Sequence, residues 1–134
     1  MPLTKQTETK PMSMGLYAHI PFCETKCSYC DFNTYEKIEH LIPSYIKALS
    51  KELLFWGNRL EHSLLDTIFL GGGTPSYLLE DHIKTLTDTI YANFELTPSR
   101  EFTIECNPTD LSPTVIQSYL SSGINRLSIG VQSL

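Results

Sequence analysis

The chain has 134 residues, 41% of them hydrophobic and 19% charged, which is enough for one domain with its own core but not for two. Ten basic against fifteen acidic residues give a net charge of −5, and this acidic balance disfavours DNA or RNA as a partner. No window approaches about 18 unbroken apolar residues, so we expect no transmembrane segment.

The start of the chain differs in composition from the rest. Residues 1–15 mix Thr, Lys, Gln, Glu, Pro and Ser without an apolar run, so we expect a disordered leader and neither a secretory signal nor a membrane anchor. Residues 16–134 contain no internal repeat and no low-complexity linker, and we expect them to belong to one domain.

After the leader, short apolar runs alternate with longer segments of helical periodicity. We expect strands at residues 16–20, 67–70, 101–106 and 126–131. We expect helices at residues 43–58 and 79–94, and a third that begins at Pro113 behind the N-cap Ser112 and stops at Gly123. In the first helix, the apolar side chains spaced for one buried stripe are Ile42, Tyr45, Ile46, Leu49, Leu53 and Trp56.

This alternation of strands and helices predicts an α/β fold with a parallel sheet. Four strands and three helices correspond to about half of a TIM-type (β/α) barrel, which typically needs about 250 residues. We therefore expect a partial barrel that is truncated after about four strands. Its last strand would present an open edge, and the half barrel alone would be weakly stable.

Three cysteines lie close together after the first expected strand. Cys23, Cys27 and Cys30 have the spacing C-x₃-C-x₂-C, which lets three thiolates face one point. A cubane iron–sulfur cluster normally takes four cysteine ligands, so this loop would leave one iron open to an exchangeable molecule. A zinc site would need His19 or Cys106 as its fourth ligand, and the chain lacks the second paired knuckle of structural zinc sites. Disulfides would need an oxidising compartment, which nothing in the N-terminus indicates.

Further candidate residues lie at the carboxyl ends of the other expected strands. Residues 71–74, Gly-Gly-Gly-Thr, follow the second strand, Glu105 and Asn107 end the third, and Gln132 follows the fourth. In barrels of parallel strands this end builds the active site. Three glycines let a bound molecule approach the backbone closely, although the segment lacks the Lys of a P-loop and the third Gly of a dinucleotide-binding fingerprint.

Three residues near this end also have structural interpretations. Glu105 ends a buried strand, where an unpaired carboxylate is costly, and a salt bridge with Arg126 is the alternative to ligand binding. Cys106 is expected to be a small apolar wall residue, whereas as a fourth cluster ligand it would displace the exchangeable molecule. His19 shares a strand face with Tyr17 and either lines the cavity or is a hydrogen-bonded structural residue.

Four segments, taken together and in order, resemble a known family. They are Tyr-x-His-Ile-Pro-Phe-Cys with the cysteine motif, Gly-Gly-Gly-Thr-Pro-Ser, Glu-x-Asn-Pro, and Gly-Ile-Asn-Arg-Leu-Ser-Ile-Gly-Val-Gln-Ser. Over residues 16–134 the chain resembles the radical S-adenosylmethionine (SAM) enzymes. Among these it resembles the oxygen-independent coproporphyrinogen III oxidases and their relatives, the radical SAM heme chaperones.

The resemblance implies a cofactor and a set of site residues. Cys23, Cys27 and Cys30 would ligate a 4Fe-4S cluster whose fourth iron is chelated by SAM. Tyr17 and Tyr29 would flank the cluster and SAM. The residues implied to contact SAM are Gly72, Gly73, Thr74, Glu105 and Gln132. No catalytic residue is assigned, and residues 16–134 would be the N-terminal part of the radical SAM core.

One position separates the two branches of the family. The oxidases carry a further cysteine two positions past the third ligand, where this chain has Phe32, so the chain resembles the heme chaperone branch. That branch binds heme and delivers it to an acceptor protein, with cluster and SAM retained. In the oxidase branch, a 5′-deoxyadenosyl radical takes a hydrogen atom from a propionate side chain, which then loses CO₂.

The same resemblance implies partners and a location. The partners are SAM, heme or a porphyrinogen, a heme-acceptor protein and an electron donor of the flavodoxin or ferredoxin type. Reduced cysteines and an oxygen-sensitive cluster make the cytoplasm the expected location. Two alternatives of other classes are a radical SAM enzyme that modifies RNA, disfavoured by the acidic charge, and a metal-binding fragment without turnover.

Overall fold

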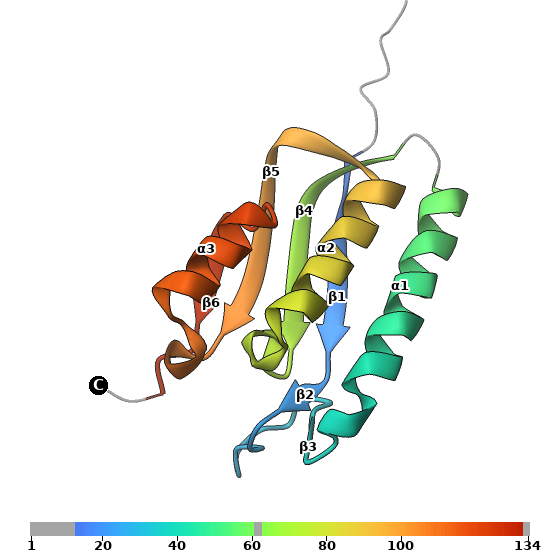
Figure 1. Ribbon diagram of the computed structural model, residues 1–134. Coiled ribbons are helices and arrows are strands. Elements are labelled where there is room, and N and C mark those ends of the chain that lie inside the picture. Colours follow the sequence, from blue (N-terminus) through green and yellow to red (C-terminus); the bar gives the residue numbers. More distant parts are fainter. Residues whose placement is uncertain (1–12, 61–62, 133–134) are drawn as a thin grey trace, which may run out of the picture.

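Four parallel strands form the central sheet. In the computed structural model, which describes residues 13–60 and 63–132, the strands follow one another across the sheet in chain order (Figure 1). They are β1 (Ser13–Ile20), β4 (Leu64–Gly72), β5 (Glu95–Cys106) and β6 (Arg126–Ile129), and each pairs in parallel with the next. The expected α/β fold with a parallel sheet is confirmed.

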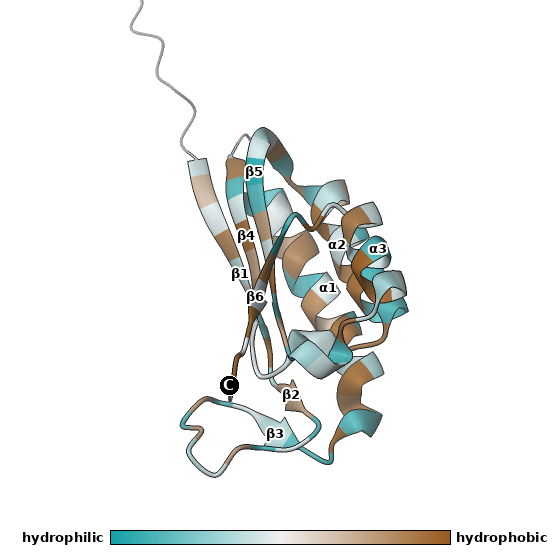
Figure 2. Ribbon diagram, turned by 90° about the vertical axis from the view of Figure 1, so that its left-hand side faces the viewer, coloured by the Kyte–Doolittle hydropathy of each residue, from teal (hydrophilic) through white to brown (hydrophobic). Residues whose placement is uncertain are grey.

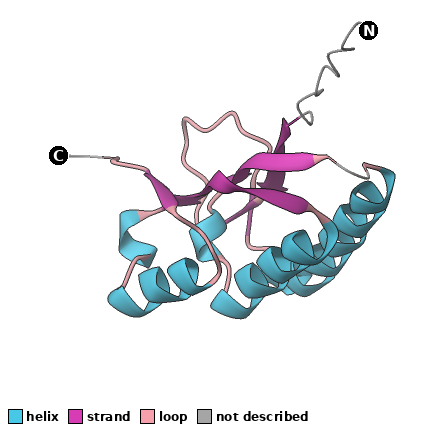
Figure 3. Cartoon of the chain, turned by 90° about the horizontal axis from the view of Figure 1, so that it is seen from above, coloured by secondary structure: helices cyan, strands magenta, loops and turns pink. Residues whose placement is uncertain are grey.

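Three helices supply the crossover connections that parallel neighbours need. They are α1 (Ile42–Arg59), α2 (Glu80–Asn93) and α3 (Pro113–Ser121). All three cover the same face of the sheet, and none of the described helices lies on the opposite face (Figures 2 and 3). Within the described ranges, no helix combines the length and hydropathy that a membrane span requires.

The helix boundaries agree closely with the sequence, but the strands extend further. β1 begins at Ser13 and not at residue 16, and β5 begins at Glu95 and not at residue 101, because both pair with the start of β4, where polar residues and a glycine interrupt the apolar runs. Only β6 is shorter than expected and ends at Ile129. The rest of the expected leader, residues 1–12, lies outside the described part of the chain.

The core lies between the sheet and the helix layer. Side chains alternate across a strand, so every second strand residue points toward the helices. The core residues contributed by the strands include Ala18, Ile20, Ile68, Leu70, Phe102 and Ile104, and those of α2 are Ile83, Leu86 and Ile90. Burying each large aliphatic side chain contributes about 1.5–3 kcal/mol, so this layer holds the carboxyl ends of the strands in fixed positions.

Helix α1 is buried less completely than its apolar stripe predicts. Ile42, Ile46 and Leu53 are buried, but Trp56 is 45% exposed. α1 lies at the edge of the helix layer, where α2 is its helical neighbour (Figure 1). The predicted stripe is therefore wrong at Trp56, because an edge helix has a neighbour on one side and not on both.

The carboxyl ends of the strands meet at the lower end of the molecule in Figure 1. Short elements gather there: the paired strands β2 (Phe22–Cys23) and β3 (Tyr35–Glu36) and the 3₁₀ helices η1 (Glu39–Leu41), η2 (Pro75–Tyr77) and η3 (Pro108–Asp110). The cysteine loop, residues 23–34, begins at the end of β2 and ends at the start of β3. This end of the sheet is therefore the place where segments distant in sequence come together.

Candidate functional site

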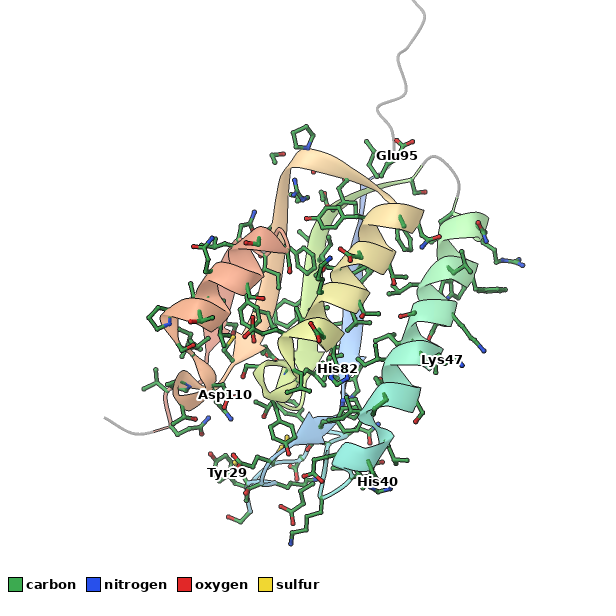
Figure 4. The ribbon with its side chains drawn as sticks, viewed as in Figure 1. Tyr29, His40, Lys47, His82, Glu95 and Asp110 are labelled. Carbon is green, nitrogen blue, oxygen red and sulfur yellow. The ribbon has the colours of Figure 1, made fainter. Side chains whose placement is uncertain are left out.

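One pocket opens at the carboxyl ends of the strands. It has a volume of about 520 Å³ and is lined by residues from four separate segments of the chain. The predicted site residues in its lining are Cys23, Cys27, Tyr29, Cys30, Gly72, Gly73, Thr74, Glu105 and Gln132. Figure 4 shows Tyr29 and Asp110 at this end of the molecule and Glu95 at the opposite end. The structure thus brings together every predicted site residue except Tyr17.

Tyr17 lies on the uncovered face of the sheet and is 59% exposed. Its ring stacks against Phe69 with the centroids 6.1 Å apart, and its hydroxyl is hydrogen-bonded to Nδ1 of His19 at 3.0 Å. Partial burial, and to a lesser degree the Glu105 carboxylate, raise the pKa of Tyr17. The phenol is therefore within electrostatic reach of a residue that lines the pocket.

The cysteine loop presents three unpaired thiols. Cys23 and Cys30 are half-buried and Cys27 is exposed. The Cys30 amide donates to the Cys27 carbonyl over 3.0 Å, which closes a tight turn between these two cysteines. From the glycine loop, the Thr74 hydroxyl donates to Sγ of Cys23 over 3.5 Å. Two of the predicted site segments therefore touch through their side chains.

This donor set fits an iron–sulfur cluster better than a single metal ion. Within residues 13–60 and 63–132, no three side chains of the His, Cys, Asp or Glu type lie close enough to hold one ion. A cluster binds each cysteine through a different iron, so it accepts thiolates that stand further apart. His19, the fourth ligand considered for zinc, has both ring nitrogens in hydrogen bonds. In this geometry His19 is therefore held by Tyr17 and Asn33.

Cys106 lines the same pocket but has a different character. It is 4% exposed, and its thiol donates to the Ile104 carbonyl over 3.6 Å. Burial, aided by the carboxylates of Asp110 and Glu105, raises the pKa of Cys106 to about 11. Burial thus disfavours the thiolate, which is the form that binds metals. The expectation of a buried wall residue agrees with its surroundings.

The glycine loop runs so close to the cysteine loop that side chains would not fit. Its backbone is tied to the end of β1 by the Gly73 amide, which donates to the Ile20 carbonyl over 2.7 Å. A β-carbon at Gly73 would lie 2.6 Å from the Phe22 carbonyl oxygen and 3.1 Å from Sγ of Cys23. Gly72 has a φ of +117°, a conformation that other residues rarely adopt. Both glycines are therefore required by the local geometry.

Glu105 does not form the salt bridge with Arg126 that the sequence suggested as an alternative. Arg126 pairs instead with Glu101, with Nη1 and Oε1 3.4 Å apart. Oε2 of Glu105 accepts the Gly72 amide over 2.9 Å. A carboxylate has about four acceptor sites, so Glu105 keeps capacity for a further donor in the pocket.

Tyr29 and Gln132 meet across the pocket mouth. The Tyr29 hydroxyl donates to Oε1 of Gln132 over 2.5 Å, although the two residues are 103 positions apart. The neighbouring Cys27 raises the pKa of the Tyr29 phenol, which favours the protonated donor form. This contact joins the cysteine loop to the segment after β6.

Sequence reasoning missed a buried serine that links two of the pocket loops. The Ser76 hydroxyl donates to Oδ2 of Asp110 over 2.6 Å and accepts the Asn107 amide over 3.0 Å. This ties the glycine loop to the loop after β5, next to Glu105. The only sequence signal was the position of Ser76 directly after Gly-Gly-Gly-Thr-Pro, and a lone serine there is not distinctive.

Comparisons with known proteins agree with this geometry. The family model for the radical SAM superfamily matches residues 17–134. The chain is 44% identical over 120 residues to the heme chaperone HemW of Bacillus subtilis (strain 168), covering 87% of this chain and 31% of that protein. It is 40% identical over 121 residues to HemW of Escherichia coli (strain K12), covering 90% of this chain and 32% of that protein. The chain thus spans under a third of the length of these relatives.

A solved structure has the same fold. The coproporphyrinogen III oxidase HemN from Escherichia coli, a radical SAM enzyme, superposes with a TM-score of 0.87 at 31% identity, over 92% of this chain and 29% of that one. The match confirms the expected partial barrel. Because the family model covers most of the chain, the chain belongs to the radical SAM superfamily, and within it the chain is similar to HemW and HemN.

Proposed function

We propose that this chain carries the cluster-binding part of a radical SAM protein that binds heme and transfers it to an acceptor protein. Membership in the superfamily implies a 4Fe-4S cluster and SAM. The observation that carries the proposal is the pocket lined by three unpaired thiols that are half-buried or exposed, whereas the fourth thiol, Cys106, is buried. This donor set leaves one position of a cubane cluster open for SAM.

The pocket residues have distinct roles in this proposal. Cys23, Cys27 and Cys30 hold three irons of the cluster. When bound, the reduced cluster supplies an electron to the sulfonium of SAM, and the protein supplies orientation and exclusion of oxygen. Glu105 offers its free acceptor sites to the amino group of SAM, and Gly73 leaves backbone groups accessible.

The remaining predicted residues enclose the bound cofactor. Thr74 donates to the Cys23 sulfur and so restrains one ligand from the side of Gly72 and Gly73. Tyr29 and Gln132 close the mouth of the pocket through their mutual hydrogen bond. Tyr17 flanks the cofactor from the uncovered sheet face, where its raised pKa keeps the phenol protonated.

Heme transfer is favoured over oxidation by position 32. Phe32 occupies the place of the additional cysteine of the oxidases, and its side chain is 71% exposed at the pocket. The curated relatives at 44% and 40% identity carry the name heme chaperone. Coproporphyrinogen oxidation is the second candidate, supported by the fold match to HemN.

The wider organisation is part of the same proposal. Residues 16–134 are the N-terminal part of the radical SAM core, and residues 13–15 extend it because they belong to β1. The partners are SAM, heme or a porphyrinogen, a heme acceptor and an electron donor of the flavodoxin or ferredoxin type. The protein acts in the cytoplasm, where thiols stay reduced.

The first test is anaerobic reconstitution with iron and sulfide, followed by electron paramagnetic resonance (EPR) of the dithionite-reduced chain with and without SAM. We expect a 4Fe-4S signal that changes when SAM is added. A signal indifferent to SAM, or zinc in place of iron, would contradict the open-iron site.

The second test separates the two functions on the same reconstituted chain. Heme binding is followed by absorbance, and coproporphyrinogen III is offered with SAM and reductant while decarboxylated product is measured. Heme binding without product supports the chaperone, whereas product formation supports the oxidase. Binding of tRNA at fixed salt, with neither porphyrin result, would favour the RNA-modifying alternative.

A further inference from the structure

We infer that His19 is a positioning residue that holds the cysteine loop in its cluster-binding shape through the backbone carbonyl of Asn33. The inference rests on the proposed function, because the exact place of this loop matters most when three thiols must reach one cluster. His19 itself lies on β1, outside the lining of the cluster pocket. It would therefore act through the loop and not by touching the cofactor.

Both ring nitrogens of His19 are engaged. Nε2 lies 2.8 Å from the carbonyl oxygen of Asn33, and Nδ1 lies 3.0 Å from the Tyr17 hydroxyl. A carbonyl oxygen can only accept, so Nε2 must carry the proton. Nδ1 is then free to accept from Tyr17. The geometry therefore directs the Nε2–H group of His19 at the loop.

The imidazole is confined from two other directions. A β-carbon at Gly72 would lie 2.6 Å from both Cε1 and Nδ1 of the ring, so the glycine makes room for the histidine. The backbone is also held, because the Tyr45 hydroxyl donates to the His19 carbonyl over 2.5 Å. A donor fixed on both sides can place its acceptor accurately.

Asn33 is the point at which the cysteine loop comes back to the fold. Directly after it, the Tyr35 amide donates to the Pro21 carbonyl over 2.8 Å and the pairing of β2 with β3 begins. Directly before it lies the segment that carries Cys30. Only two residues separate Cys30 from Asn33, so a shift of Asn33 is passed to the thiol with little chain to absorb it.

A second side chain contacts the same segment, but more weakly. The Lys26 ammonium donates to the carbonyls of Phe32 over 3.4 Å and of Thr34 over 3.2 Å. Lys26 is exposed, whereas His19 is half-buried and makes the shorter bond. Distance and burial together assign the main restraint to His19.

The test compares two amide substitutions that differ in reach by one methylene. In H19Q the side-chain nitrogen can occupy the place of Nε2 and donate to Asn33, whereas in H19N it stops near the place of Nδ1. His40, an exposed histidine of η1, supplies the matched control H40N. The full 134-residue chain is used throughout.

Hydrogen exchange of the metal-free chain is the first readout. Loss of one hydrogen bond should raise exchange of the Thr34 and Tyr35 amides about fivefold in H19N. H19Q and H40N should stay within about twofold of wild type. Exchange in α2 serves as an internal reference for the fold. Equal exchange in H19N and H19Q would overturn the inference, and so would loss of protection in α2, which would assign His19 a general stabilising role.

The EPR spectrum after anaerobic reconstitution is the second readout. We expect less bound iron per chain and a broadened reduced signal in H19N, and recovery of the wild-type spectrum in H19Q. A wild-type spectrum in H19N would overturn the inference. If wild type itself assembles no SAM-responsive cluster, the proposed function fails, while the exchange experiment still decides whether His19 holds the loop.

Discussion

Glu105 lies at the carboxyl end of β5, beside the Gly72 amide and in the lining of the pocket. Its carboxylate accepts the Gly72 amide and faces a cavity that also receives the three thiols. A glutamine at this position keeps the size and one acceptor oxygen but loses the charge. The distinction between a structural and a ligand-binding role therefore depends on the charge.

We expect E105Q to weaken SAM binding to the reconstituted chain about tenfold, since a charge-assisted hydrogen bond exceeds a neutral one by about 1.4 kcal/mol. Titration of the cluster EPR signal with SAM measures the affinity. E101Q, on the same strand but paired with Arg126, is the control and should bind SAM as wild type does. Equal affinity in E105Q and wild type would leave Glu105 with a structural role alone.

The Cys106 thiol should make the fold sensitive to alkaline pH. Its pKa is raised to about 11 by burial, against about 8.5 in an unfolded chain. Below both values the thiol is protonated in the folded and in the unfolded chain, so it adds no pH dependence to the free energy of unfolding. Between them only the unfolded chain releases the proton, and the free energy of unfolding falls by up to about 3 kcal/mol from pH 8 to 11.

Urea denaturation of wild type and C106A across this pH range measures how much the Cys106 thiol contributes to the free energy of unfolding. C106A should be less stable than wild type at pH 8, because it leaves a small cavity, and the difference should shrink as the pH rises. A constant difference would mean that the thiol is accessible to solvent in the folded protein.

At the scale of the elements, the glycine loop and the cysteine loop are packed backbone to backbone. G73A would bring a β-carbon within 2.6 Å of the Phe22 carbonyl and 2.9 Å of the Ile20 carbonyl, neither of which can move without breaking the loop. We expect a loss of about 1–3 kcal/mol in the free energy of unfolding, together with reduced iron binding.

G130A is the matched control, because its β-carbon would meet the side-chain nitrogen of Gln132, which can turn away. Urea denaturation and iron content of both variants provide the comparison. A G73A variant as stable as G130A would show that the two loops can separate.

Helix α3 begins where local chemistry predicts. The Ser112 side chain accepts the Val115 amide over 3.2 Å, and Pro113 occupies the first helical position. S112A should lower the free energy of unfolding by about 1 kcal/mol. Ser121, whose hydroxyl donates back to the Gln117 carbonyl within the helix, provides the control S121A, with an expected change near zero. Thermal or urea denaturation measures both, and equal effects would argue against a capping role.

At the scale of the whole molecule, the sheet is covered by helices on one face, and two strands lie at its edges. Both β1 and β6 are edge strands within the described sheet (Figure 1). Large side chains such as Tyr17 and Trp56 are more than two-fifths exposed. Such a half-covered sheet buries less apolar surface per residue than a closed barrel does.

We therefore expect a free energy of unfolding below about 5 kcal/mol, the low end of the range for natural domains. Urea denaturation followed by circular dichroism measures it. A cooperative transition that extrapolates to more than about 10 kcal/mol would contradict this expectation. Addition of a stabilising cluster should raise the midpoint, because a ligand that binds only the folded state shifts the equilibrium toward it.

Features with a local cause were predictable from the sequence. The spacing of Cys23, Cys27 and Cys30, the glycine run and the start of α3 at Pro113 each depend on a few consecutive residues. The parallel α/β fold also followed, because apolar periodicity reports which residues of an element face the core. These features led to the same pocket because the carboxyl ends of parallel strands meet at one edge of the sheet.

Contacts between distant segments were decided by the tertiary structure alone. Arg126 pairs with Glu101 while Glu105 accepts the Gly72 amide, and Tyr29 meets Gln132 across 103 residues. The exposure of Trp56 follows from the edge position of α1. Periodicity determines which way a side chain faces, but its partner depends on how two separate elements are aligned, and no short stretch of sequence contains that information.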